Sequence, residues 1–100
     1  MDTQKAEKIF AALGQETRLQ ILSLLAHSDN GDMPAGDISL ALGIPQNTLS
    51  FHLNHLERED LLTRKRKGRF IIYGLNARKV DELILFAAKN LRRADDEKAA

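Results

Sequence analysis

Apolar positions recur with the period of an α-helix in the first part of the chain. Ile9, Phe10 and Leu13 fall on one face and predict a first helix over about residues 4–13, which Gly14 ends. The second predicted helix lies within QETRLQILSLLAHS and is apolar over most of its circumference. We therefore expect the second helix to form the centre of the core, and the DNGDMP segment after it to be a turn-rich loop.

Two closely spaced helices follow and predict a helix-turn-helix over about residues 36–59. The first of them, in AGDISLALG, ends at Gly43, because glycine readily adopts the left-handed conformation of a helix C-cap. Ile44 and Pro45 restart the chain, since proline suits the first turn of a helix and not its interior. The second helix of the pair then begins at about Gln46.

Beyond the helix-turn-helix the apolar period changes from that of a helix to that of a strand. Two extended runs predict a β-hairpin over about residues 61–75, with Gly68 at a positive-φ turn position. A last helix over about residues 78–92 carries one apolar stripe, and residues 94–100 form a polar tail. We expect a single domain over residues 1–100, mainly α with a β-hairpin wing, in the order α-α-α-α-β-β-α.

Charge is distributed unevenly along the chain. The 100 residues carry a net charge of +1, but residues 1–60 carry −5 and residues 61–100 carry +6. The charge is densest in RKRKGR, at the tip of the predicted hairpin. Such blocks commonly contact polyanions, and the alternative is an ordinary solvated loop. The wing cations are Arg64, Lys65, Arg66, Lys67 and Arg69.

The helix after Pro45 contrasts with this basic block, because its segment NTLSFHLNHL contains no charged side chain. On a helical wheel, Leu49, Leu53 and Leu56 face one way, toward the core. The opposite face suits the edges of DNA bases: Asn can bond adenine, Ser can bond several bases, and Phe can pack on a thymine methyl group. The alternative is an ordinary amphipathic helix with an amide-rich exposed face. The candidate base-reading residues are Gln46, Asn47, Thr48, Ser50, Phe51, Asn54 and Arg58.

His52 and His55, three residues apart on this helix, raise the question of a metal site. Their spacing is compatible with a two-ligand patch, but no third ligand of a suitable type is near in the sequence. His52 also lies beside the leucine stripe, where a buried, hydrogen-bonded imidazole is the commoner state. We therefore expect no metal and no cofactor.

The chain lacks the residues that several classes of function need. The chain has no cysteine, which excludes disulfides, thiolate metal sites and thiol redox switches, and which fits a reducing cytosol. No apolar stretch approaches the roughly 20 residues of a membrane span, so we expect a cytoplasmic protein without membrane association. No Ser/His/Asp set, Gly-rich phosphate loop or metal-ligand cluster is visible, so an enzyme is not expected.

Three segments together give the chain a family resemblance. ALGQETRLQILSLL, DISLALGIPQNTLSFHLNHLEREDLL and RKGRFIIYGLN stand in an order and spacing that resemble the arsenic-repressor-type (ArsR/SmtB) family of winged helix-turn-helix regulators. The resemblance covers about residues 6–92. It implies a homodimer that represses transcription by binding an imperfect palindrome in double-stranded DNA. The family's DNA-contact positions correspond to Gln46, Asn47, Ser50 and Phe51.

The resemblance also implies a dimer interface on the first and last helices. Their spare apolar faces agree with this, because a chain of 100 residues would struggle to cover them alone. The residues expected at the interface are Ile9, Phe10, Leu13, Val80, Leu83, Ile84, Ala87 and Leu91.

Departures from the family pattern bear on regulation. DISLALG lacks the cysteines of one class of metal sensor, and the last helix offers Asp81 and Glu82 but no histidine, so neither family metal site is expected. Pro45 stands where a capping serine is common, and Asp60 where glycine is common. The effector is unknown: the repressor could be constitutive, bind an organic molecule at the dimer interface, or be displaced by a partner. A winged helix that binds protein or RNA is the alternative function, because a fold alone does not fix function.

Overall fold

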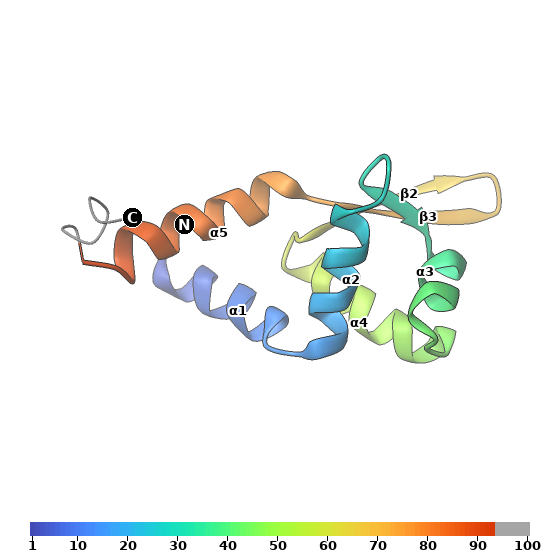
Figure 1. Cartoon of the computed structure of the whole chain (residues 1–100), viewed down its shortest axis with the longest axis horizontal. Helices are drawn as coiled ribbons and strands as arrows, with labels where there is room; N and C mark the ends of the chain where they lie inside the picture. Colours follow the sequence, from blue (N-terminus) through green and yellow to red (C-terminus); the bar gives the residue numbers. More distant parts are fainter. Residues whose placement is uncertain (94–100) are drawn as a thin grey trace.

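The computed structural model describes residues 1–93, which form five helices and one small antiparallel sheet (Figure 1). The elements are α1 (Thr3–Leu13), α2 (Glu16–Ala26), β1 (Asp32–Pro34), α3 (Ala35–Leu42), α4 (Gln46–Arg58), β2 (Leu62–Lys67), β3 (Phe70–Leu75) and α5 (Ala77–Asn90). The mainly helical fold with a hairpin wing is confirmed. The polar tail predicted for residues 94–100 lies outside the described residues.

The sheet contains one strand that the sequence did not predict. β1 pairs antiparallel with β3, which also pairs with β2, so the strand order is β1-β3-β2. Gly31, at φ +72°, turns the chain into β1, and its carbonyl accepts the Leu75 N–H at 2.8 Å. Three residues are too few to show alternation, and Pro34 at the strand's end is typical of a loop. The loop predicted for DNGDMP is therefore corrected to a turn followed by a short strand.

The core lies between α2, α3, α4 and one face of the sheet. α2 contacts α3, α4, β1 and β3, which confirms its predicted central place. The leucine stripe of α4 points inward as the helical wheel predicted. The largest fully buried side chains are Ile21, Leu25, Ile38, Leu49, Leu53, Leu56 and Leu61.

The turn between α3 and α4 is held by local hydrogen bonds. Gly43 closes α3 at φ +66°, as predicted, and Ile44 then bonds Ser39 twice: its N–H donates to the Ser39 carbonyl at 3.2 Å, and its carbonyl accepts the Ser39 hydroxyl. Pro45 opens α4 and offers no side-chain cap. The two helices of the helix-turn-helix are thus fixed at a defined angle, with the start of α4 close to the end of α3.

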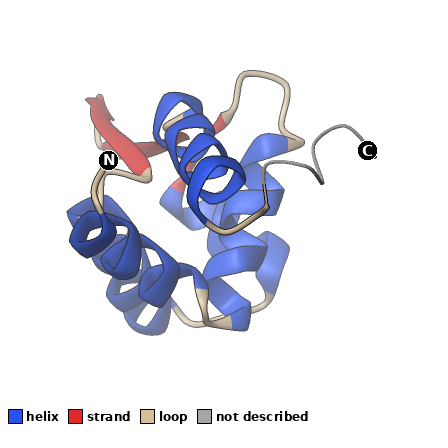
Figure 2. Cartoon of the chain, turned by 90° about the vertical axis from the view of Figure 1, so that its left-hand side faces the viewer, coloured by secondary structure: helices blue, strands red, loops and turns tan. Residues whose placement is uncertain are grey.

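The molecule is elongated, with extents of 50 × 26 × 22 Å. α1 and α5 contact each other at one end, and the β2–β3 hairpin projects at the opposite end (Figure 1). In the view from the first end, α1 and α5 stand in the foreground (Figure 2). The helix-turn-helix and the wing are therefore on the far side of the molecule from this helical end.

Candidate nucleic-acid interface

The solvent-exposed face of α4 carries all the residues that the sequence nominated for base reading. We call these residues the reading face: Gln46, Asn47, Thr48, Ser50, Phe51, Asn54 and Arg58, all exposed. Phe51 is 66% exposed, an unusual state for a phenylalanine. The face holds no carboxylate and a single cation at its far end, so it offers hydrogen-bonding groups without repelling phosphate.

The two asparagines of the reading face are in different states. The Oδ1 atom of Asn47 accepts the Thr48 N–H at 2.9 Å, so Asn47 partly replaces the cap that Pro45 cannot provide. The Asn54 side chain makes no hydrogen bond within residues 1–93. A bidentate contact to adenine needs both the oxygen and the nitrogen of the amide. Asn54 is therefore the better placed of the two for such a contact.

The wing cations divide into two groups. Two cations at the base of the hairpin have carboxylate partners: Arg64 lies 3.9 Å from Glu57 of α4, and Lys65 lies 3.5 Å from Asp32 of β1. Exposed pairs of this kind contribute little stability, but they place each cation and offset its charge. The remaining three, Arg66, Lys67 and Arg69, form the tip cations and have no such partner within the described part of the chain.

The tip of the wing is shaped by its own backbone. Gly68 turns the hairpin at φ +62°, as predicted, and its carbonyl accepts the Arg66 Nε–H at 3.2 Å. The Arg69 guanidinium lies 5.8 Å from the centre of the Phe70 ring, which is within cation–π range. The tip therefore presents three exposed cations in a small area, the arrangement that a phosphate backbone or a narrow minor groove attracts.

Gly74 of β3 allows the base of the wing to pack closely. A Cβ atom at this position would lie 2.7 Å from the Thr63 hydroxyl oxygen and 3.5 Å from the Asp32 Cβ atom. Gly74 stands between these two residues in the sheet, paired with both. The missing side chain leaves room for Asp32 to approach Lys65 across the sheet, so β1 contributes a carboxylate to the wing that sequence reasoning missed.

A buried polar pair links α2 to α4, and sequence reasoning also missed this pair. Arg18 and His52 are each only 8% exposed, and the Arg18 Nη1 atom lies 3.2 Å from the His52 Nδ1 atom. Burial, followed by the charges of Arg18 and His55, lowers the pKa of His52 below the ordinary 6.5. Arg18 lies three and seven residues before the buried Ile21 and Leu25. The helical period therefore puts Arg18 on the buried face of α2, and this spacing is the signal that the sequence offered.

The two histidines of α4 lie in different surroundings. His52 is buried and its Nδ1 atom faces a guanidinium, whereas His55 is only partly buried on the same helix. Within residues 1–93, no three His, Asp or Glu side chains gather where they could hold a metal ion. The same residues include no helix with the length and apolar character needed to cross a membrane.

The residues predicted for the dimer interface fall into buried and exposed sets. Ile9 and Leu83 are buried inside the chain and belong to its own core, so they are not free to meet a partner. Leu13, Val80 and Ala87 are half-buried. Four exposed apolar side chains at this end of the molecule form what we call the end face: Phe10, Ile84, Leu85 and Leu91.

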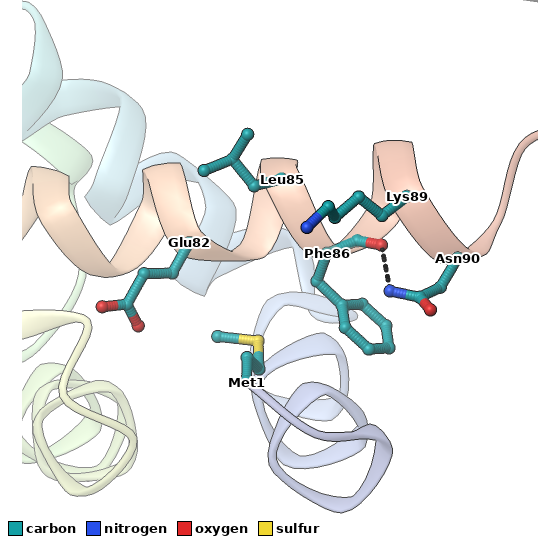
Figure 3. Close-up of a pocket in the computed structure, with 6 residues that line it drawn as sticks. All are labelled: Met1, Glu82, Leu85, Phe86, Lys89 and Asn90. Carbon is teal, nitrogen blue, oxygen red and sulfur yellow. Dashed lines mark hydrogen bonds between the residues drawn. The ribbon is translucent and has the colours of Figure 1, made fainter. Parts of the chain in front are cut away.

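A shallow pocket lies beside the end face, between the start of α1 and α5 (Figure 3). The Phe86 ring points from α5 toward α1 and Met1, and the Asn90 side chain donates to the Phe86 carbonyl at 3.0 Å. Glu82, Leu85 and Lys89 complete the lining. The pocket and the end face show that the chain itself leaves part of the apolar surface at this end exposed.

Comparison with known proteins places this arrangement in a family. A family of helix-turn-helix domains matches residues 13–65. The transcriptional repressor SdpR of Bacillus subtilis is 35% identical over 89 residues, which is 89% of this chain and 96% of SdpR. The sequence similarity thus extends across the helix-turn-helix and the wing together.

Solved structures agree with the sequence comparison. An ArsR-like transcriptional regulator from Rhodococcus sp. RHA1 superposes with a TM-score of 0.80 at 25% identity, over 96% of this chain and 88% of that one. A homodimeric winged helix-turn-helix DNA-binding domain from Mycobacterium bovis, a possible ArsR-family regulator, gives a TM-score of 0.71 at 26% identity, over 89% of this chain and 83% of that one. The chain therefore belongs to the ArsR-type family of winged helix-turn-helix transcriptional regulators.

Proposed function

We propose that this regulator is a homodimeric repressor that binds an imperfect palindrome in double-stranded DNA. The observation that carries the proposal is the reading face of α4, which is exposed, rich in hydrogen-bonding groups and followed by a basic wing. In the proposed complex α4 enters the major groove, and Ser50, Phe51 and Asn54 contact base edges. The tip cations contact phosphates or enter the adjacent minor groove.

Dimerisation through α1 and α5 is supported by the apolar end face. Ile84 and Leu85 are each about three-fifths exposed (59% and 62%), and they lie on the same helix as the partly covered Phe86. Exposed apolar patches of this kind mark interaction sites in small soluble proteins. A two-fold dimer would present two reading faces to two half-sites about 34 Å apart, one helical turn of DNA.

Repression is the proposed sign of regulation, because SdpR is a repressor and resembles this chain over nearly its whole length. Metal sensing is not part of the proposal, since the chain contains no cysteine and α5 contains no histidine. The proposed place of action is the cytoplasm, where the regulator meets its DNA.

The proposal is tested with two labelled duplexes at physiological salt. One contains the DNA upstream of the protein's own gene, and the other is a scrambled copy. We expect fluorescence anisotropy to show a preference of about 10³-fold or more for the first duplex. The preference should fall by about 2–4 kcal/mol in Ser50→Ala/Asn54→Ala, while binding to the scrambled duplex should change little.

The other outcomes separate the alternatives. Equal, salt-sensitive binding to both duplexes would leave the wing assignment intact and show that the operator is elsewhere in the genome. Binding to neither duplex at micromolar protein, together with binding to single-stranded RNA or to a protein partner, would favour the interaction-module function over DNA binding.

A further inference from the structure

The Arg18 guanidinium is buried without a carboxylate partner. Its Nε–H donates to the carbonyl of Ala12, and its Nη1 atom lies 3.2 Å from the His52 Nδ1 atom. Within residues 1–93 no ion pair to Arg18 is formed. Burying a charge against neutral acceptors alone costs free energy, and an aliphatic side chain would fill the same space without that cost. This cost indicates that the guanidinium has a role beyond filling space in the core.

The contact with Arg18 fixes the state of the His52 ring. A guanidinium can only donate, so the Nδ1 atom of His52 must accept and the ring proton must reside on Nε2. Burial and the nearby Arg18 guanidinium both lower the pKa of His52 and so favour this neutral imidazole. His52 is thereby held in one tautomer and one orientation inside the core.

The His52 ring in turn contacts the reading face. Its centre lies 5.4 Å from the centre of the Phe51 ring, and the two rings meet edge to face at 75°. Aromatic pairs favour this geometry. Because Phe51 is otherwise largely exposed, contact with a fixed imidazole restricts the positions that its ring can adopt.

Arg18 also connects these residues to α1. Ala12 is in the last turn of α1, where backbone carbonyls lack partners within the helix, and Arg18 satisfies one of them. One side chain on α2 therefore bonds to the end of α1 and to the middle of α4. Arg18 therefore connects α4, at His52 beside Phe51, to α1 and α2.

We propose that Arg18 is a positioning residue for base reading, which holds His52 and, through it, the Phe51 ring in the orientation that α4 presents to DNA. The inference rests on the proposed function, because it assumes that Phe51 touches a base. Arg18 itself lies in the core and contacts no DNA. Its effect should therefore appear only through the residue that it positions.

The test is a double-mutant cycle on a defined duplex. A randomised duplex library is first enriched on the unaltered protein, and the best-binding duplex is used throughout. We expect Arg18→Met and Phe51→Ala each to weaken binding to this duplex by about tenfold, and the double variant to lose no more than either alone. Binding to a scrambled duplex should stay within about twofold in all three.

Asn54→Ala is the matched control, because Asn54 shares the reading face and, within residues 1–93, makes no hydrogen bond with Arg18 or His52. Combining Arg18→Met with Asn54→Ala should multiply the two losses. If the losses in affinity of Arg18→Met and Phe51→Ala also multiply in their double variant, the proposal is overturned and Arg18 is a purely structural residue. Circular dichroism melts confirm folding. If Arg18→Met does not fold, Arg18→Lys, which keeps the charge but loses the planar fork, gives the same cycle.

The library step separates the inference from the proposed function. If the unaltered protein enriches no sequence, the proposed function fails before any variant is measured. If it enriches a sequence and Phe51→Ala binds that sequence as well as the parent, Phe51 touches no base and the positioning role of Arg18 is refuted on its own.

Discussion

At the scale of single residues, the most informative site is the imidazole of His52, which titrates differently in the folded and unfolded chains. Burial, followed by the electrostatic effect of Arg18 and of His55, lowers the pKa of His52 in the folded protein, whereas in the unfolded chain it returns to about 6.5. Below this pH the unfolded chain binds a proton that the folded protein resists. The contribution of His52 to stability is therefore complete above pH 6.5 and is lost as the pH falls.

We predict that the free energy of unfolding decreases between pH 7.5 and pH 5.5, with a slope of at most about 1.4 kcal/mol per pH unit from this residue. Urea unfolding at a series of pH values measures the slope. His52→Gln, whose amide oxygen can still accept from Arg18, should remove this component. An unchanged slope in that variant would show that other groups cause the pH dependence.

For single residues, the sequence predicts which face of a helix a side chain lies on better than it predicts hydrogen bonds between buried side chains. The helical period alone identifies the leucine stripe and the reading face, because each depends only on spacing within one helix. The Arg18–His52 contact joins residues 34 positions apart, so no local pattern shows it. The state of Asn47 was missed for a similar reason, since it follows from the absence of a cap at Pro45 and from the fold of the turn.

At the scale of the elements, the backbone just after the end of α4 adopts an unusual left-handed conformation. Asp60 has φ +60°, the only positive φ at a residue other than glycine within residues 1–93. The Asn76 side chain donates to the Asp60 carbonyl at 2.8 Å and helps to hold the bend before β2. The family resemblance implied that glycine is common at this position, and the left-handed conformation of Asp60 agrees with it.

We predict that Asp60→Val lowers the free energy of unfolding by about 1–2 kcal/mol, because a β-branched side chain crowds the left-handed conformation. Asp60→Gly should not lower it. Thermal melts of the two variants check the order. At Asp81, inside α5, the same two substitutions should rank in the opposite order, since glycine is the poorer helix former.

The wing gives a prediction at the same scale. Replacing Arg66 and Lys67 by alanine should weaken binding to specific and scrambled duplexes to a similar extent, because in the proposed complex the tip cations contact phosphates. The slope of log K against log[salt] should flatten by up to about 2. Anisotropy titrations at four salt concentrations give this slope.

Arg64 and Lys65 provide the matched comparison for the wing, since Glu57 and Asp32 already offset their charges. Their double alanine variant should change the slope less than the tip variant does. A tip variant with the salt slope of the parent would show that the wing does not contact the backbone.

Helices and the hairpin were predictable because each shows its period over at least eight residues or around a diagnostic turn. α3 and the turn at Gly43 are examples, since an apolar stripe and a left-handed glycine coincide there. β1 was not predictable, because its three residues gain their strand geometry only by pairing with β3, 40 residues away along the chain.

At the scale of the whole molecule, the proposed dimer depends on the end face. Ile84→Lys places a charge on an exposed residue of α5 and should leave the monomer folded, because the side chain is 59% exposed. We predict that this variant sediments as a monomer. Its affinity for a two-half-site duplex should fall by about 100-fold, while its affinity for a single half-site should be unchanged.

Leu40→Lys is the control for the dimer, because Leu40 is 83% exposed but lies on α3, away from α1 and α5. This variant should sediment like the parent. If Ile84→Lys also does so, the interface lies elsewhere on the surface. The sequence predicted spare apolar faces on the first and last helices, and exposed apolar side chains do lie there, but it could not separate them from Ile9 and Leu83, which the chain buries itself.

The separation of the end face from the wing along the 50 Å axis gives the molecule the proportions of a lever. If two copies join at α1 and α5, the two reading faces lie far from this contact. A slight rotation of one copy at the contact, too small to disturb any hydrogen bond within either copy, would then move the reading faces by a larger distance. Two α4 helices that must enter grooves about 34 Å apart would lose their match to the duplex. Control of such a repressor would require only a change of angle, with no unfolding of the parts that touch DNA.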